Sequence, residues 1–414
     1  MDNYNNMRTL LVSAYSCEPL KGSEPAVGWN WVIELAKRNR VHVITRANNK
    51  TVIEQHLPND IKGNIVFHYY DTPDIIKNLK RKDKGLYFYN FCWQIGIVGL
   101  AKSIIRKEKI DYILHLTFGS VWMPTFLPLL NPKFVWGPMG GGECVPFSFI
   151  GVLPLKQRIV QLFRYILNYT TIINPLILLP ACKSKVILAR TPNTRDIMPF
   201  FTRKKTRILL ETAMEDDIFK REKTDYGADV IQMVISARFI SIKNIPLIIK
   251  ALKYIQTSIP WKLTLLGSGP DKKLIENTIM AEGVGQLVSI IPYLPRKEAL
   301  DMIEQSDIFI FPSLKEGGTW ALMEAMAIGL PVVCLKWAGM AVETTPDTAF
   351  QIPISNPAKM EKDFGHAISL LINNQQLRKK MGQAARKRIK EVFNWDAKGL
   401  YMQALFDEID NKKE

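Results

Sequence analysis

The residues best suited to chemistry lie in a glycine-rich loop, Glu316-Gly317-Gly318-Thr319, between an apolar run and a helical pattern. The run predicts a buried strand, and the pattern predicts a helix that starts near Thr319. The free N–H groups and partial positive charge of a helix start bind phosphate, and Gly317 and Gly318 allow a close backbone approach. Glu316 in the loop and Glu324 in the helix cannot bind phosphate, but their carboxylates can accept hydrogen bonds from sugar and ribose hydroxyls.

A second pair of charged side chains, Arg238 and Lys243, directly follows a predicted strand at Val230–Ala237. The guanidinium is a forked donor and the ammonium is a point charge, and both suit phosphate oxygens. Ligands of parallel sheets bind beyond the carboxyl ends of the strands. The position of the pair therefore indicates that it meets a diphosphate, although the two residues alone are not a specific signal.

These residues stand in a chain of alternating strand and helix patterns. Strands are predicted at Thr9–Tyr15, Val41–Thr45, Asn64–Tyr70, Tyr112–Thr117, Phe134–Trp136, Val230–Ala237, Lys262–Leu266, Val288–Ile291 and Ile308–Phe311. Alternation that occurs twice predicts an α/β protein of two doubly wound, Rossmann-like domains. The segment Thr202–Asp229 lacks a regular pattern, so we place the boundary near residue 205. After Ala358 the patterns are helical.

The second half resembles the family-4 retaining glycosyltransferases, which have the GT-B fold. The resemblance rests on three motifs: Arg238-x4-Lys243, Leu266-Gly267-Ser268-Gly269-Pro270, and Glu316-x7-Glu324 followed by Gly329-Leu330-Pro331. It implies two Rossmann-like domains facing a central cleft. Residues 1–205 would bind the acceptor and residues 206–395 the nucleotide sugar, and a C-terminal helix at about 396–414 would pack back on the first domain.

The resemblance also implies roles for single residues of the second domain. Arg238, Lys243 and Glu316 are expected to be catalytic. The expected donor-binding residues are Gly267, Gly317, Gly318, Thr319 and Glu324. Two departures from the family pattern affect this assignment. The usual Glu-Gly-Phe-Gly is Glu316-Gly317-Gly318-Thr319 here, and the usual glycine after the lysine is Asn244.

The first domain resembles a bacterial subgroup of the family around two loops and one histidine. The loop Lys21-Gly22-Ser23-Glu24 and the loop Gly140-Gly141-Gly142-Glu143 are expected on the acceptor side. The expected acceptor-binding residues are Gly22, Ser23, Glu24, Gly140, Gly141 and Gly142. His115 follows a predicted strand at the place where the family often has a histidine near the donor sugar, so it is counted as catalytic.

The positive charge of the chain is concentrated in the first half. Residues 1–205 have 28 basic and 13 acidic side chains (+15), and the remainder has 27 basic and 26 acidic (+1). Such asymmetry indicates a polyanionic partner, which could be a membrane surface, a nucleic acid or a phosphorylated substrate. The alternative is that the basic surface is only solvated and has no such partner. The cluster Lys80-Arg81-Lys82, with Lys84, precedes the aromatic run Tyr87–Trp93, which suits an anionic membrane surface as well as a buried helix.

Other classes of chemistry are disfavoured by what the sequence contains. The apolar stretches Leu86–Ala101 and Tyr165–Cys182 are too short or too interrupted to span a bilayer, and no leader is predicted. The five cysteines are scattered, the five histidines lack zinc spacing, and there is no Asp-x-Asp or P-loop motif. We therefore expect no metal and no cofactor, and a cytoplasmic protein on the inner face of the cytoplasmic membrane.

The leading hypothesis is a metal-independent, retaining glycosyltransferase. Its partners would be a nucleotide diphosphate sugar, a saccharide or lipid-linked acceptor of bacterial cell-surface glycan synthesis, and an anionic membrane surface. The alternatives are another GT-B enzyme, such as an epimerase or a phosphorylase, and a basic nucleic-acid binding protein. Aromatic residues that are not interleaved with Lys and Arg weaken the last alternative, so no nucleic-acid partner is expected.

Overall fold

The computed structural model of the protein describes residues 7–79, 85–227 and 229–412. The chain folds as two units, the first comprising Met1–Gly142, Leu167–Glu211 and Trp395–Glu414, and the second comprising Glu143–Ile166 and Thr212–Asn394. The chain thus passes between the units more often than a single boundary near residue 205 implies.

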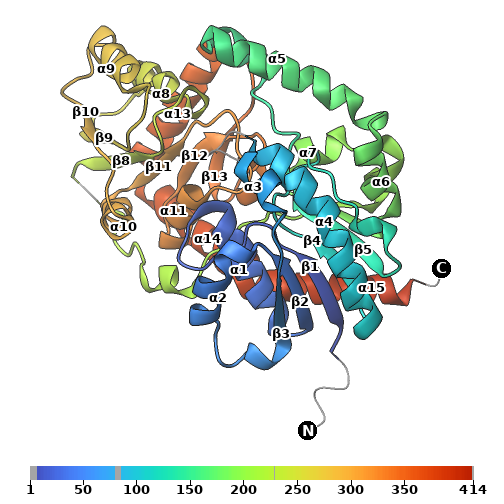
Figure 1. The fold of residues 1–414 in the computed structure, drawn as a ribbon. Coiled ribbons are helices and arrows are strands. Elements are labelled where there is room, and N and C mark those ends of the chain that lie inside the picture. The colour runs from blue at the N-terminus through green and yellow to red at the C-terminus, as the bar shows by residue number, and fades with distance from the viewer. Residues whose placement is uncertain (1–6, 80–84, 228, 413–414) are drawn as a thin grey trace. The chain divides into compact units, whose positions relative to one another are not determined.

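The first unit is built on a seven-stranded parallel sheet with the order β3-β2-β1-β4-β5-β6-β7 (Figure 1). The strands are β1 Thr9–Ser13, β2 Arg40–Thr45, β3 Ile65–Tyr69, β4 Tyr112–His115, β5 Lys133–Met139, β6 Val186–Ala189 and β7 Thr206–Ile208. In register, Val12 of β1 pairs with Val43 and with Leu114. Strand order reverses beside β1, between β1 and β4, which makes this the switch point of a Rossmann-like sheet.

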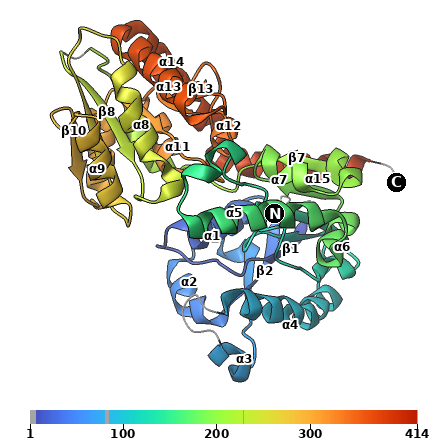
Figure 2. The same cartoon turned by 90° about the horizontal axis from the view of Figure 1, so that it is seen from above.

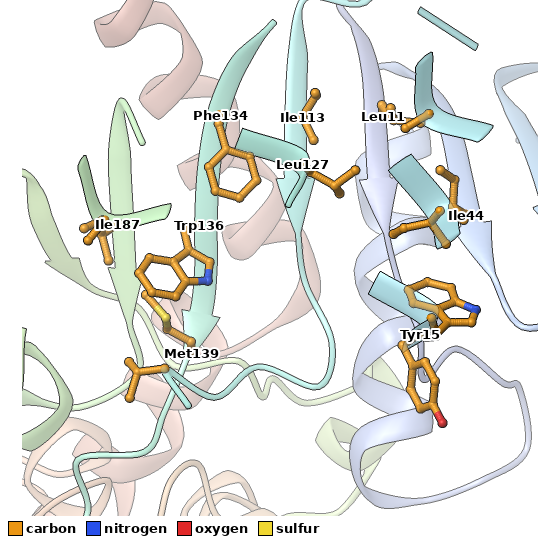
Figure 3. Packing of buried hydrophobic residues seen from close by; sticks show 14 of the residues in the cluster. Leu11, Tyr15, Ile44, Ile113, Leu127, Phe134, Trp136, Met139 and Ile187 are labelled. Carbon is orange, nitrogen blue, oxygen red and sulfur yellow. The ribbon is translucent and has the colours of Figure 1, made fainter. Parts of the chain in front are cut away.

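The core of the first unit packs around the strands of this sheet (Figure 3), and α4 and α6 contribute side chains such as Trp93 and Ile177 to it. The helices of the unit are α1 Ser23–Ala36, α2 Lys50–His56, α3 Asp74–Leu79, α4 Leu86–Lys107, α6 Pro175–Lys183, α7 Pro192–Ile197 and α15 Trp395–Asn411. Continuous apolar runs such as that of β1 are buried on both faces, as parallel strands covered by helices require. The face opposite α4 and α6 is covered by α1 and α15. Their side chains Trp31 and Trp395 pack edge to face, with 5.7 Å between the ring centres.

The aromatic run expected either in a membrane surface or in the core lies on α4. Tyr89, Trp93 and Ile97 are buried in the core, whereas Tyr87 and Phe88 are exposed. One side of α4 is therefore a core face, and Trp93 is not available to a membrane. The basic cluster Lys80–Lys84 lies outside the described residues.

The second unit is built on a six-stranded parallel sheet with the order β10-β9-β8-β11-β12-β13, again a Rossmann-like order with its switch point between β8 and β11. Its strands are β8 Ile231–Ser236, β9 Trp261–Leu266, β10 Val288–Ile291, β11 Ile308–Phe311, β12 Val332–Leu335 and β13 Ala349–Ile352. Its helices are α8 Ile245–Ala251, α9 Lys272–Ala281, α10 Arg296–Gln305, α11 Trp320–Ile328, α12 Met340–Glu343, α13 Pro357–Asn373 and α14 Gln375–Val392. Figure 2 shows α13 and α14 side by side.

The segment Glu143–Ile166 belongs to the second unit, although the sequence placed it within residues 1–205. Contacts with the second unit explain this difference, because Trp337 Nε1 donates to the Cys144 carbonyl at 3.0 Å and Ser148 Oγ donates to the Ser355 carbonyl at 2.9 Å. The segment includes most of α5, Leu155–Tyr169. No single helix in the described ranges could cross a membrane by length and composition; only the pair Leu155–Ile172 and Pro175–Lys183, bent by 53°, meets those criteria together.

The two Rossmann-like units confirm the α/β fold class, and their sheet orders are those expected of the GT-B fold.

Candidate functional site

A pocket of about 780 Å³ opens at the carboxyl edge of the second sheet, around its switch point. Six of the residues singled out by the sequence line it: Arg238, Lys243, Gly267, Glu316, Gly318 and Thr319. They come from the loops that follow β8, β9 and β11. Since the carboxyl ends of neighbouring parallel strands share one edge, residues far apart in the sequence converge there.

Two of the three cationic residues that line the pocket, Arg238 and Lys243, are in different electrostatic states. Lys243 Nζ forms an ion pair with Glu316 Oε1, which also accepts a hydrogen bond from Ser313 Oγ. The ammonium lies 5.1 Å from the ring centre of Phe311. Arg238 is exposed, and no acidic side chain of the described residues pairs with it. The guanidinium is therefore the available positive charge, while the charge of Lys243 is shared with Glu316.

The start of α11 is held by a carboxylate that the sequence analysis did not identify. Thr319 donates its backbone N–H to Glu343 Oε1 and its hydroxyl to Glu343 Oε2, the latter at 2.7 Å, and Glu343 is fully buried. The amide of Thr319 is thus occupied. Among the described residues, the amides of Trp320 and Ala321 have no acceptor, and both residues line the pocket. The first turn of α11 therefore still offers donors to an anion.

The glycines of the pocket are required by packing within the unit. A Cβ on Gly318 would lie 1.9 Å from Thr212 Oγ1, and Gly267, at φ +148°, would place a Cβ 2.0 Å from the Ala237 carbonyl oxygen. A Cβ on Gly339 would lie 1.5 Å from the carbonyl oxygen of Gly317. The loops fit together only without these side chains, which fixes the backbone that surrounds the pocket.

Glu324 lies beside the pocket rather than in its lining. Its Oε1 accepts a hydrogen bond from Arg296 Nε at 2.9 Å, and Arg296 itself lines the pocket at the first position of α10. Burial raises the pKa of the Glu324 carboxyl, and the charge of Arg296 opposes that rise. Any hydroxyl that reaches Glu324 must share the carboxylate with Arg296.

The sequence analysis therefore missed three residues of this site. Glu343 ends α12, after β12, and Tyr293 and Arg296 follow β10, with Tyr293 largely exposed at the pocket. The signal that could have found them is their position, since each follows a strand and so lies at the carboxyl edge of the sheet.

In the first unit, His115 is the last residue of β4 and is completely buried. Neither of its ring nitrogens has a hydrogen-bond partner among the described residues. Burial lowers the pKa of His115 to about 4, so the imidazole is neutral at pH 7.

The loop that precedes α1 is tied to the loop that follows β4. Glu24 Oε1 accepts hydrogen bonds from the backbone N–H groups of Phe118, at 2.6 Å, and Gly119, at 3.3 Å. Burial raises the pKa of Glu24, and these two bonds oppose that rise. Ser23 adopts a positive φ of 61°, next to Gly22 at the N-cap. Glu24 thus links the two loops at the switch point of the first sheet.

The three consecutive glycines are buried at the end of β5. Gly140 donates its N–H to the Gly119 carbonyl at 2.8 Å, which joins this loop to the one held by Glu24. A Cβ on Gly140 would collide with the guanidinium of Arg190, and a Cβ on Gly142 would lie 2.3 Å from the Asn193 carbonyl oxygen. Gly141 has a φ of +125°, which only glycine adopts readily. The structure thus brings the predicted residues of the first unit together at one sheet edge.

Comparison with known proteins finds similarity to glycosyltransferases. Residues 216–388 match the family described as glycosyl transferases group 1. An uncharacterized glycosyltransferase of Methanocaldococcus jannaschii is 26% identical over 378 residues, which cover 87% of this chain and 95% of the relative. The amylovoran biosynthesis glycosyltransferase AmsK of Erwinia amylovora is 28% identical over 134 residues, which cover 31% of this chain and 33% of AmsK.

A solved structure agrees over nearly the whole chain. HepE of Anabaena, in complex with UDP, superimposes with a TM-score of 0.59 at 13% identity, covering 97% of this chain and 100% of that one. Most of the second unit therefore matches the group 1 glycosyltransferases, and the fold predicted from the sequence is confirmed.

Proposed function

From a chain that carries a group 1 glycosyltransferase domain, we propose an enzyme that transfers a sugar from a nucleotide diphosphate sugar to an acceptor with retention at the anomeric carbon. The observation that carries the proposal is the pocket at the switch point of the second sheet. It combines the exposed cation of Arg238, the paired cation of Lys243 and the first turn of α11. These are three kinds of donor suited to one diphosphate.

The diphosphate of the donor would lie between Arg238 and the first turn of α11, with Gly267, Gly317, Gly318 and Thr319 forming the surrounding backbone. As the bond to the sugar breaks, negative charge grows on the leaving diphosphate. Preorganised donors that face this charge stabilise the transition state without reorganisation. In this proposal cationic side chains take that role instead of a metal ion, and no cofactor is required.

The two glutamates would bind hydroxyl groups. Glu316 faces the pocket with one oxygen committed to Lys243 and Ser313, so its remaining lone pairs would bind the transferred sugar and hold it in place. Glu324 would accept a hydrogen bond from the ribose while Arg296 keeps its charge balanced. A ribose does not change during transfer, so Glu324 would serve binding and Glu316 would serve turnover.

The first unit would supply the acceptor side. We place the acceptor near the loops that carry Gly22–Glu24 and Gly140–Gly142. His115 would act as a neutral group near the donor sugar, because its buried imidazole has two unpaired nitrogens and a lowered pKa. The acceptor class we propose is a saccharide or lipid-linked intermediate of a surface glycan, in line with the polysaccharide named for AmsK.

Such an acceptor favours a position on the inner face of the cytoplasmic membrane. The excess of basic side chains in residues 1–205 supports this location. The match to glycosyltransferases favours transfer over epimerase or phosphorylase chemistry, and we propose no nucleic-acid partner.

A panel of UDP-, GDP- and ADP-sugars tests the donor class. A ligand that binds only the native state at 100 times its Kd adds about 2.7 kcal/mol to the stability, which a thermal unfolding scan detects. We expect one nucleotide class to raise the Tm and its sugar to be hydrolysed slowly without acceptor. If no nucleotide sugar changes the Tm or is consumed, the proposed donor class is wrong.

A further inference from the structure

Helix α5 presents its apolar side to solvent and its polar side to the protein, the reverse of an ordinary amphipathic helix. Gln161 is buried and Gln157 and Arg164 are half-buried. The exposed large apolar side chains of the helix are Leu155, Ile159, Val160, Leu162, Phe163, Ile166 and Tyr169. Five of the seven, at positions 155, 159, 162, 166 and 169, recur at intervals of four and three and so form one stripe along the helix.

Hydrogen bonds within the second unit hold α5 in this orientation. Gln161 Oε1 accepts from the Val145 N–H at 3.4 Å, and Gln157 Nε2 donates to Ser241 Oγ at 3.3 Å. The hydroxyl of Tyr165 donates to the Val145 carbonyl at 2.8 Å. Turning the helix to bury its stripe would break all three bonds, so the exposure of the stripe is fixed by the fold.

Further exposed apolar side chains flank α5 in the sequence on both sides. Phe147 and Val152 precede it, and Ile172, Ile173 and Leu176 follow it, all exposed. Soluble monomers rarely expose an apolar stripe like that of α5, and where they do it marks an interaction site.

The charge of the same segment identifies the partner. Between Glu143 and Asp196 the sequence has no acidic residue and seven basic ones. Two of these, Lys156 and Arg158, are exposed and lie on either side of the stripe. An apolar stripe flanked by cations matches the interface of acyl chains and anionic headgroups in a bilayer. Docking into the groove of a partner protein would not explain why the segment between Glu143 and Asp196 has no acidic residue.

We propose that α5 lies flat in the surface of an anionic lipid bilayer, with its stripe inserted among the acyl chains and its basic flanks at the headgroups. At 15 residues it is shorter than the about 20 needed to cross a bilayer, so it lies in the plane. The proposal deepens the peripheral location proposed above and rests on it. It moves the docking surface from the region of Lys80–Lys84 and Tyr87–Trp93 to α5.

Cosedimentation with sucrose-loaded vesicles tests this surface, with the full chain as the sample. The vesicles contain phosphatidylcholine with or without phosphatidylglycerol. The test variant is Ile159→Gln, Leu162→Gln, Ile166→Gln, three stripe positions whose side chains are 60%, 42% and 63% exposed. The matched control is Leu274→Gln, Leu370→Gln, Leu400→Gln, with 52%, 54% and 54% exposure on three other helices.

We expect the wild type and the control to bind the mixed vesicles. The test variant should bind at least about 1,000-fold more weakly, since each of its three inserted side chains contributes about tenfold or more. Lys156→Gln with Arg158→Gln should weaken binding to mixed vesicles about 30-fold and leave binding to phosphatidylcholine alone unchanged. Equal Tm values show that all variants are folded.

Three results would overturn the proposal. The first is no binding of the wild type to mixed vesicles at low salt. The second is loss of binding on changing Lys80–Lys84 to Gln while the α5 variant binds normally. The third is a wild-type dimer in sedimentation velocity that only the α5 variant makes monomeric, which would assign the stripe to self-association. Since binding is measured without turnover, a failed donor assay leaves this test intact.

Discussion

Removing the guanidinium in Arg238→Ala should impair the enzyme more cleanly than any other single change in the pocket. Arg238 is exposed and pairs with no acidic side chain in the described chain, so its loss leaves no carboxylate without a partner. Lys243→Ala differs, because Glu316 would lose the ammonium with which it pairs while it is only 16% exposed. The effect of Arg238→Ala therefore reports on the ligand alone.

The expected magnitude follows from the bonds the guanidinium can make to a phosphate. A charge-assisted hydrogen bond contributes about 1.5–3 kcal/mol, which corresponds to about a 10- to 150-fold loss in kcat/KM. Since the interaction strengthens as the leaving diphosphate gains charge, part of the loss should fall on kcat. The Tm should change little, because an exposed side chain contributes little to stability.

The assay is steady-state transfer, or donor hydrolysis if the acceptor is not yet identified, with Arg40→Ala as a control. Arg40 is likewise exposed, in the first unit. Its only ion pair within residues 7–79, 85–227 and 229–412 is with Glu108, at an N–O distance of 3.8 Å. We expect the control to keep wild-type kinetics. Wild-type kcat/KM in Arg238→Ala, or an equal loss in both variants, would falsify the placement of the diphosphate.

Three further predictions concern the pocket of the second unit and His115 of the first unit. Glu324→Ala should raise KM with little change in kcat, and Glu316→Ala should lower kcat; full kinetics for both variants check this, and exchanged effects would refute the division of roles. Transfer should persist in EDTA, because cationic side chains face the diphosphate; activity abolished by EDTA and restored by manganese would contradict that. Burial lowers the pKa of His115 to about 4 in the native state, whereas the unfolded chain protonates this imidazole already below about pH 6.5. As the pH falls from about 6.5 to about 4, protonation therefore favours the unfolded state, and the native state loses up to about 3 kcal/mol of stability through this residue. Urea titrations of the wild type and His115→Gln across that range measure the loss, and equal slopes against pH in the two proteins would mean that His115 does not carry it.

Much of the fold could be predicted because parallel strands are locally encoded. The continuous apolar runs of β8 and β11 are visible in the sequence, and their alternation with helices fixes the class. β7 was missed because it has only three residues, Thr206–Ile208, directly after a basic run. Helical patterns were expected only after Ala358, whereas α13 starts at Pro357. Asn356 caps the helix and Pro357 opens it, a pair of signals that a search for apolar periodicity overlooks.

Helix α5 shows what a pattern cannot decide. Its sequence is strongly amphipathic, and the usual expectation is that the apolar side faces the core. Here Gln161 is buried and Ile166 exposed, because Val145 and Ser241, distant in the sequence, bond to the polar side. The orientation depends on tertiary contacts that no window of sequence contains.

The candidate site divides in the same way. Arg238, Lys243 and Glu316 could be found because each lies in a loop directly after a strand. Glu343, which holds Thr319, comes from a later element, so only the fold reveals the contact. The packing that requires glycine at position 318 involves Thr212, more than 100 residues earlier, and could not be read locally.

The most direct test of the central claim is a crystal structure of the protein with the nucleotide sugar that raises its Tm most. The account predicts density for the diphosphate in the pocket at the switch point between β8 and β11, within hydrogen-bond distance of Arg238 and the amides of Trp320 and Ala321. A nucleotide bound elsewhere on the chain, or in this pocket with its diphosphate turned away from Arg238, would contradict it.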